Sequence, residues 1–155
     1  MSGGAAPTPD DAAAQRRVLF VDDDEGLRDY VSNVLTRMPG VEVVTAASGE
    51  DAMAVMQRDS FDVIVSDQRM GKIDGVQVLE AAAKLQEGAP RVLVTGYADL
   101  DLTEEAVNTG HVTRMLSKPF LPQDLTALVA PLLHERRAAE ARASAFSRAV
   151  SAAAG

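Results

Sequence analysis

Five short apolar segments alternate with five stretches in which apolar residues recur at helical spacing, and this alternation limits the fold more than any other feature of the sequence. It predicts strands at residues 17–21, 41–45, 61–66, 91–95 and 112–116, and helices at 27–38, 48–59, 76–86, 99–109 and from Pro122 onward. Strands that alternate with helices through short connections form parallel sheets with helices on both faces, because the crossovers are right-handed. The sequence therefore predicts an α/β fold with a five-stranded, doubly wound parallel sheet.

The predicted sheet and its helices occupy residues 16–134, and the regions on either side differ from them in composition. Residues 1–15 are rich in Ala, Gly, Pro and Asp without periodicity, which predicts a disordered tail. Residues 135–155 are Ala-rich and charged, which predicts a helical extension or linker. Two interpretations of this extension stay open: a solvated continuation of the last helix, or a coiled coil that forms a homodimer. The ragged heptad pattern behind the second interpretation consists of Leu125, Leu128, Leu132, Ala139 and Phe146, with Glu135 and Arg142 interrupting it.

The charge balance argues against several functional classes. With 15 Lys and Arg against 23 Asp and Glu, the formal net charge is −8, which is unfavourable for direct contact with nucleic-acid phosphates. The absence of Cys excludes disulfides and thiolate metal sites. No apolar stretch approaches the roughly 20 residues of a membrane span, and the N-terminus lacks the basic start and apolar core of a signal peptide. We therefore expect a cytoplasmic protein without membrane contact.

Polar and charged residues follow the predicted strands at the points where those strands end. Asp22–Asp24 follow the first strand, Asp67 the third and Lys118 the fifth, while Thr95 ends the fourth. Because the carboxyl ends of parallel strands lie on one edge of the sheet, we expect these side chains to meet in one crevice. Clustered carboxylates require a cation or raised pKa values, and hard oxygen ligands without His or Cys favour Mg²⁺. An acidic site beside a hydroxyl and an ammonium group is suited to phosphoryl chemistry.

Each of these residues also has an ordinary structural interpretation. Asp67 can serve only as a turn residue at the end of its strand. Asp24 is expected to cap the following helix rather than to bind a metal. Thr95 alone is a common strand-end residue, and Lys118 alone is a typical surface lysine. Their coincidence at four strand ends favours a shared functional site.

Four segments resemble the receiver domain of bacterial two-component response regulators, the CheY-like family. They are VLFVDDDEGLR, DVIVSDQRMGKIDG, VLVTGYAD and LSKPF, in the order and spacing of that family. The resemblance extends from Arg17 to His134 and implies a flavodoxin-like strand order of 2-1-3-4-5. The sequence around TGYADL and LSKPF also resembles, more weakly, receivers that precede signalling enzymes such as cyclic-di-GMP phosphodiesterases.

The resemblance implies a role for each of the clustered residues. Asp67 would be the phosphoacceptor, attacking a phosphohistidine on a sensor histidine kinase or phosphotransfer protein. Thr95 would bind a phosphoryl oxygen and Lys118 would pair with the phosphoryl group. The Lys118–Pro119 bond is cis in many such domains, which a proline at this position allows.

A magnesium site is implied around the same aspartate. Asp23 and Asp67 would bind Mg²⁺ directly, Asp22 would act through a water molecule, and Arg69 would contribute its backbone carbonyl. The phosphorylated domain would then change its contacts with a downstream protein effector. By this resemblance the chain is a signalling domain rather than an enzyme.

The sequence departs from the family pattern at positions linked to switching. Gly71 lies four residues after Asp67, where the family commonly has Pro, and predicts a more flexible loop. Met115 occupies the place of an aromatic residue that moves inward on activation, so Tyr97 is an alternative moving aromatic. Arg69 and Tyr97 occupy the two positions thought to tune dephosphorylation, where bulky side chains are expected to hinder water.

Two other functions compete with phosphoryl acceptance. A receiver-like interaction module that no longer needs phosphate is consistent with Gly71 and Met115, although the complete set of site residues argues against it. A Mg²⁺-dependent phosphohydrolase would need an acid/base carboxylate two residues beyond the nucleophile, where this chain has Arg69. The kinase, the effector, and whether the chain acts alone or within a longer regulator stay open.

Overall fold

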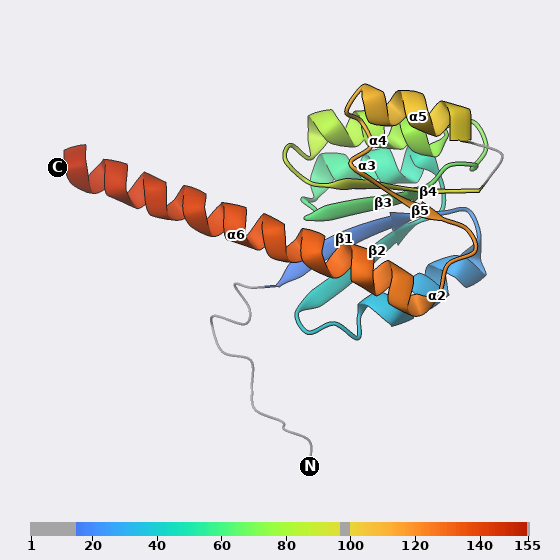
Figure 1. Cartoon of the computed structure of the whole chain (residues 1–155), viewed down its shortest axis with the longest axis horizontal. Helices are drawn as coiled ribbons and strands as arrows, with labels where there is room; N and C mark the ends of the chain where they lie inside the picture. Colours follow the sequence, from blue (N-terminus) through green and yellow to red (C-terminus); the bar gives the residue numbers. More distant parts are fainter. Residues whose placement is uncertain (1–14, 97–99, 155) are drawn as a thin grey trace, which may run out of the picture.

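The computed structural model describes residues 15–96 and 100–154, and Figure 1 shows the arrangement of its strands and helices. The strands are β1 (Arg16–Val21), β2 (Val41–Ala46), β3 (Val63–Asp67), β4 (Arg91–Thr95) and β5 (Arg114–Ser117). The helices are α2 (Glu25–Leu35), α3 (Gly49–Arg58), α4 (Gly75–Leu85), α5 (Leu100–Asn108) and α6 (Pro122–Ala154). The predicted tail at residues 1–14 lies outside the described residues.

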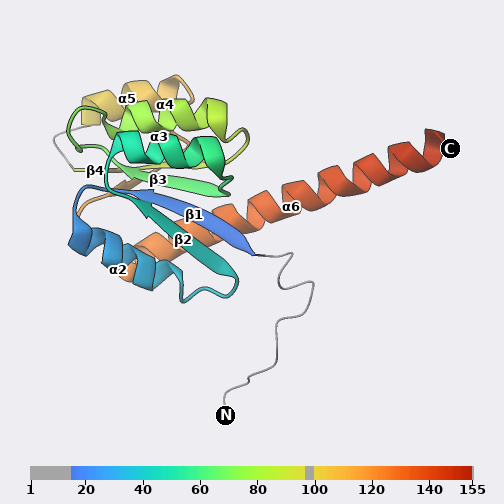
Figure 2. The same ribbon diagram turned by 180° about the vertical axis from the view of Figure 1, so that it is seen from behind.

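The strands form one parallel sheet in the order β2-β1-β3-β4-β5, which confirms the predicted fold class and strand order. All four neighbouring pairs are parallel, and the register pairs Val21 with Ser66 and Asp67 with Val94. Helices α3, α4 and α5 cover one face of the sheet, while α2 and the first half of α6 cover the other (Figures 1 and 2). The carboxyl ends of the strands therefore share one edge.

The core has two halves because alternate residues of the central strands point to opposite faces. On one side Leu19, Ile64 and Leu93 pack against apolar residues of α3, α4 and α5. On the other side, alternate residues of the same strands pack against α2 and α6, contributed by Val18, Phe20, Val63, Val65, Val92 and Val94. Strands buried on both faces read as continuous apolar runs, which explains why the sequence reveals them clearly.

Several predicted boundaries were wrong by two or three residues. The third strand begins at Val63 rather than at Phe61. Helix α2 ends at Leu35 rather than at Met38, since Thr36 already forms its C-cap. The fifth strand begins at Arg114 rather than at Val112, although Val112 itself is buried. This strand lies at the edge of the sheet and exposes most of its side chains, so its apolar pattern is weak.

Side chains cap the helix starts that the sequence indicated. Asp24 accepts a hydrogen bond from the Leu27 backbone N–H at 3.1 Å, which confirms its predicted capping role. Ser48 accepts a bond from the backbone N–H of Asp51 at the start of α3. At α4 a reciprocal capping box joins Asp74 and Gln77.

Helix α6 runs for 33 residues and projects well beyond the sheet (Figure 1). Pro131 lies inside it, on the exposed side, where the loss of one backbone hydrogen bond is tolerated by contact with water. Among the described residues, none of the helices has the length and apolar character needed to cross a membrane.

Candidate functional site

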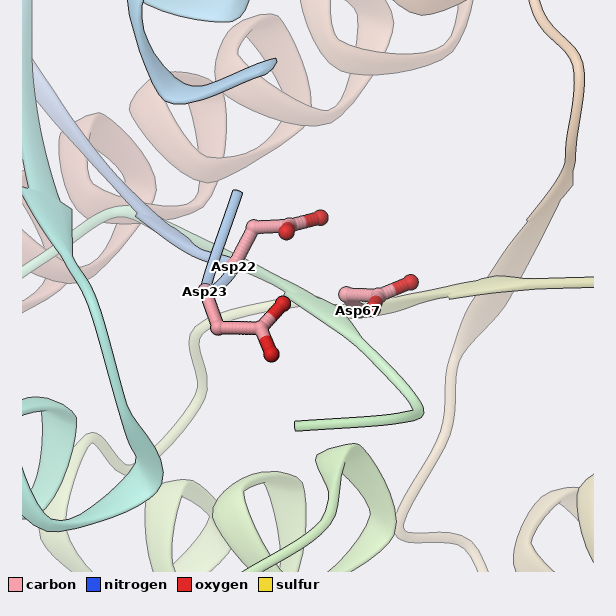
Figure 3. Close-up of side chains that lie close together, drawn as sticks. All are labelled: Asp22, Asp23 and Asp67. Carbon is pink, nitrogen blue, oxygen red and sulfur yellow. The ribbon is translucent and has the colours of Figure 1, made fainter. Parts of the chain in front are cut away.

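Three carboxylates meet at the carboxyl edge of the sheet, as the sequence predicted. Asp22 follows β1 and is only 1% exposed, Asp67 ends β3 and is 6% exposed, and Asp23 is exposed to solvent. One oxygen atom from each lies within 4.8 Å of the others. Figure 3 shows the three side chains gathered in the same space beyond the strand ends. The parallel register brings them together although Asp67 lies more than 40 residues from the other two.

Lys118 completes this cluster from the end of β5. Its Nζ lies 2.7 Å from Asp67 Oδ1 and 3.8 Å from Asp22 Oδ2. Its backbone N–H donates to the Thr95 carbonyl at 3.0 Å, which holds the end of β5 against β4. The Lys118–Pro119 peptide bond is cis, as the family resemblance implied.

Burial and charge shift the pKa values of two groups of the cluster, Asp22 and Lys118. Burial raises the pKa of Asp22 to about 6, with the negative charges of Asp67 and Asp23 acting in the same direction. The hydrogen bond from the Asp24 backbone N–H to Asp22 Oδ1 opposes this rise, as does the charge of Lys118. Burial alone lowers the pKa of Lys118, but its hydrogen bond to Asp67 and the surrounding carboxylates outweigh burial and raise the pKa overall. Lys118 is therefore an ammonium cation at neutral pH.

The cluster has the donor chemistry of a magnesium site. Its ligand atoms are all carboxylate oxygens, which Mg²⁺ prefers to nitrogen or sulfur donors. Asp22 Oδ2 is buried and has no hydrogen-bond partner among the described residues. A buried carboxylate oxygen without a partner is costly, and a hydrated cation would satisfy it. The residues present therefore fit Mg²⁺.

Thr95 lies at the same edge with a buried side chain. It is 1% exposed, and its hydroxyl donates to the backbone carbonyl of Gly96 at 3.1 Å. This bond is local, so rotation of the side chain would free the hydroxyl for a ligand at the edge. The structure thus brings Thr95, Lys118 and the three aspartates to one side of the sheet.

The loop after Asp67 adopts a backbone conformation that is incompatible with proline at position 71, where the family commonly has one. Gly71 has a φ of 99°, a value that proline cannot adopt because its ring fixes φ near −65°. Among the residues that the structure describes, none lies within 4 Å of a Cβ atom built at Gly71, so the backbone conformation and not crowding favours glycine there.

Three residues that support the site were missed by the sequence analysis. Gln68 accepts a hydrogen bond from the backbone N–H of Val76 through Oε1, and Gly75 donates its N–H to the Gln68 carbonyl. A Cβ at Gly75 would overlap the carbonyl oxygen of Asp67, so only glycine allows α4 to begin this close to the phosphoacceptor candidate. Arg28 donates to the Asp22 carbonyl at 2.9 Å. In the sequence, the glycine that follows the helix cap Asp74 was the one local indication of a supporting residue. Nothing in the sequence around Gln68 or Arg28 indicates such a role.

The residues expected to tune switching are only partly described. Arg69 is exposed beside Asp67, and Met115 on β5 is 39% exposed. Tyr97 lies outside the described residues.

Comparison with known proteins agrees with the fold and the site. Residues 18–130 match the family model of the response regulator receiver domain. Over 102 residues the chain is 36% identical to the transcriptional regulatory protein GlrR of Escherichia coli, covering 66% of this chain and 22% of GlrR. It is 27% identical to the sporulation initiation phosphotransferase F of Bacillus subtilis, covering 67% of this chain and 82% of that protein. The chain thus spans about a fifth of the length of the regulator GlrR, but most of the length of the smaller phosphotransferase.

A solved structure shows the same architecture. The CheY-like response regulator receiver domain protein from Methanospirillum hungatei is 31% identical and superposes with a TM-score of 0.73, covering 79% of this chain and 97% of that chain. The sheet has the flavodoxin-like order 2-1-3-4-5, and the acidic cluster lies at the carboxyl edge, where sheets of this kind bind ligands. The chain belongs to the response regulator receiver domain family.

Proposed function

We propose that Asp67 accepts a phosphoryl group from a phosphohistidine of a sensor histidine kinase or a phosphotransfer protein. The observation that carries the proposal is the 2.7 Å contact between Asp67 and Lys118 inside a cluster of three carboxylates at the carboxyl edge of the sheet. A carboxylate that already has an ammonium partner is poised to receive a group with more negative charge than its own.

The transfer itself is a displacement at phosphorus. A carboxylate oxygen of Asp67 forms the new P–O bond while the P–N bond to the donor imidazole breaks, and the imidazole nitrogen leaves with the bonding electrons. The product is an aspartyl phosphate at the end of β3. Because carboxylates are weak nucleophiles, positioning and charge stabilisation provide most of the acceleration.

Mg²⁺ would be held by Asp23 and Asp67 directly, by Asp22 through water and by the Arg69 backbone carbonyl. When bound, the ion would neutralise charge on the transferring phosphoryl group. The close carboxylate oxygens support this assignment, as does Asp22 Oδ2, which accepts no hydrogen bond from the described residues.

Lys118 and Thr95 would bind the phosphoryl group after transfer. Lys118 pairs with Asp67 in this structure. Its ammonium group would move to a phosphoryl oxygen as the carboxylate becomes an acyl phosphate and loses its own charge. Thr95 would exchange its bond to the Gly96 carbonyl for a bond to a second phosphoryl oxygen. These exchanges would bias the loops at the strand ends toward a second conformation.

The domain would then transmit the signal through protein contacts. We propose that residues 16–134 form the receiver and residues 135–155 an extension or linker, and that the chain is a signalling domain and not an enzyme. The names of two relatives support the signalling role, since one is a transcriptional regulatory protein and the other a sporulation initiation phosphotransferase. A protein effector is expected, whether encoded in the same chain or separate.

The proposal is tested by phosphorylation with a small donor. Incubation with Mg²⁺ and acetyl phosphate or phosphoramidate should add the mass of one phosphoryl group, and Asp67→Asn should abolish the gain. The matched control is Asp29→Asn, which removes an exposed aspartate of α2 and should leave the gain unchanged. Chelation of divalent cations should suppress the reaction in the wild type.

The alternatives predict different results. No mass gain in the wild type, with either small donors or a phosphorylated histidine kinase, would favour a phosphate-independent interaction module. Sustained release of phosphate from small substrates would favour a phosphohydrolase. A gain that persists in Asp67→Asn would place the acceptor at another residue.

A further inference from the structure

Gln68 follows Asp67 directly and joins the end of β3 to two neighbouring elements. The residue is only 3% exposed. Its Oε1 atom accepts a hydrogen bond from the Val76 backbone N–H at 2.9 Å, and its main-chain carbonyl accepts one from Gly75 at 3.0 Å. Its own backbone N–H donates to the Val94 carbonyl at 3.0 Å. This one residue therefore connects β3 to β4 and to the first turn of α4.

These bonds complete the amino-terminal end of α4. The first four backbone N–H groups of a helix have no partner within the helix. In α4, the capping box satisfies the first and the last of these groups, those of Asp74 and Gln77. Gln68 satisfies the two between them, those of Gly75 and Val76. The start of the helix is therefore bound to the end of the strand, and not only to its own cap.

The segment between these bonded groups, residues 69–74, which we call the β3–α4 loop, also packs against the protein along its length. Met70 is 7% exposed and belongs to the core cluster on the side of α3, α4 and α5. Ile73 lies so close to Gly49 at the start of α3 that a Cβ atom on this glycine would be 2.5 Å from Ile73 Cγ2. The exposed residues of the loop are Arg69, Gly71 and Lys72. The loop is thus held at both ends and at two points along its length.

We propose that Gln68 is a positioning residue for the magnesium site. This role rests on the proposed function, in which the Arg69 backbone carbonyl binds Mg²⁺ together with Asp23 and Asp67. Arg69 follows Gln68 directly, so the anchored backbone of Gln68 limits the positions that the Arg69 carbonyl can adopt. A group that is held in place before binding loses less conformational freedom when its ligand arrives. Hydrogen bonds that orient metal ligands from behind typically change metal affinity by about 10- to 100-fold.

Gln77 provides a matched comparison, because it makes a similar bond without bridging the loop. Its Oε1 atom accepts from the Asp74 backbone N–H at 2.9 Å, three residues earlier in the chain. The bond between Gln68 and Val76 has the same length but spans eight residues, across the whole β3–α4 loop. If Gln68 only stabilised the start of α4, loss of either bond would have the same effect on Mg²⁺ binding. Because Gln68 also fixes the loop, its loss alone should weaken Mg²⁺ binding.

Titration of the full chain with MgCl₂, followed by amide chemical shifts in NMR spectra without a phosphoryl donor, measures the dissociation constant of Mg²⁺. Gln68→Met keeps a side chain of similar length but removes the acceptor oxygen, and it should raise this constant about tenfold. Gln77→Met removes the corresponding oxygen from the capping box and should leave the constant nearly unchanged. In the metal-free protein, hydrogen exchange at the Val76 amide should become faster in Gln68→Met and not in Gln77→Met.

A second variant and the rate of phosphorylation separate positioning from a general loss of structure. Gln68→Asn keeps the amide but is one methylene shorter, so it should also weaken Mg²⁺ binding because it cannot reach Val76. The dispersion of the same NMR spectra shows whether each variant is folded. With phosphoramidate as the donor, both Gln68 variants should need about tenfold more Mg²⁺ for the half-maximal rate, while the rate at saturating Mg²⁺ should approach that of the wild type.

Failure of this role can be distinguished from failure of the proposed function. The role of Gln68 would be overturned if its folded variants bound Mg²⁺ as tightly as the wild type, or if Gln77→Met lost as much affinity. A wild type that binds Mg²⁺ but gains no phosphoryl group would refute the role of Asp67 as acceptor and leave the positioning role of Gln68 intact. A wild type that binds no Mg²⁺ would overturn both the magnesium site and the role of Gln68.

Discussion

At the scale of one residue, the burial of Asp22 serves the candidate site but lowers the stability of the fold. Its carboxylate is buried, shares a small space with two other aspartates, and keeps one oxygen without a hydrogen-bond partner among the described residues. The backbone N–H of Asp24 donates to this carboxylate, and Arg28 of α2 donates to the main-chain carbonyl of Asp22. Such an arrangement is costly for the fold alone and is accounted for by a cation that the site is proposed to bind.

The raised pKa of Asp22 gives a prediction about pH. Its pKa is about 6 in the folded protein against 3.8 for the free group, so between these values the folded state binds more protons than the unfolded state. The free energy of unfolding should therefore fall as pH rises through this window, and the full loss should be present above about pH 6. Because Asp22→Asn removes the ionisable group, this fall in the free energy of unfolding should disappear. The variant should have a free energy of unfolding higher by about 2 kcal/mol at neutral pH, with little difference below about pH 4.

Urea denaturation across this pH range, without divalent cations, measures the effect. Asp29→Asn is the control for removal of one exposed negative charge. Equal pH dependence in the wild type and Asp22→Asn would contradict the assignment. Added Mg²⁺ should stabilise the wild type by mass action and should stabilise Asp22→Asn less.

At the scale of an element, the start of α4 determines where Asp67 can lie. The helix begins directly beneath the end of β3, with Asp74 and Gln77 capping it and Gly75 donating to the Gln68 carbonyl. This close approach leaves no room for a side chain at Gly75. The helix and the strand therefore form one rigid support for the aspartate.

Gly75→Ala tests this support. Its Cβ would overlap the Asp67 carbonyl oxygen and lie 2.8 Å from Leu93 Cδ1, so backbone as well as side chains must move. We expect a loss of about 3 kcal/mol in the free energy of unfolding, together with slower phosphorylation of the folded protein. Chemical denaturation and the small-donor assay measure the two effects. Gly96→Ala is the stability control, because a Cβ there meets none of the described residues within 4 Å and its φ is not positive. Equal stability of the two variants would disprove steric crowding at Gly75.

At the scale of the whole molecule, α6 joins two parts with different roles. Its first half completes the core beneath the sheet, with Leu125 and Val129 fully buried, whereas the side chains of residues 141–154 are all exposed. The ion pairs of Arg136 and Glu140 mark the boundary between them.

Removal of residues 141–155 should therefore leave the domain intact. We expect the midpoint of thermal unfolding and the extent of phosphorylation to match those of the full chain, because the side chains of residues 141–154 are exposed. Scanning calorimetry and the small-donor assay measure the two quantities; a large fall in the unfolding midpoint would show that these residues contribute to the core.

Local patterns in the sequence were sufficient for the fold and for much of the site. Buried parallel strands appear as unbroken apolar runs, and caps such as Asp24 and Asp74 act within one turn of a helix. Once the elements are ordered, the topology alone places Asp22, Asp23, Asp67, Thr95 and Lys118 at one edge. The exposed edge strand β5 was located least accurately, since its burial pattern is weak.

Tertiary structure alone decided the contacts that join distant elements. Gln86 looked like an ordinary helix residue, but its amide binds the backbone of Phe61, Met56 and Asp59 and so joins α4 to the end of α3 and the approach to β3. The 2.7 Å contact of Lys118 with Asp67, the crowding at Gly75 and the exit of α6 at Arg136 are likewise set by groups far apart in the chain. Periodicity and capping depend on neighbours within a few residues, so the sequence displays them directly. Distances between side chains on different elements depend on how the whole core packs, and only the folded structure fixes them.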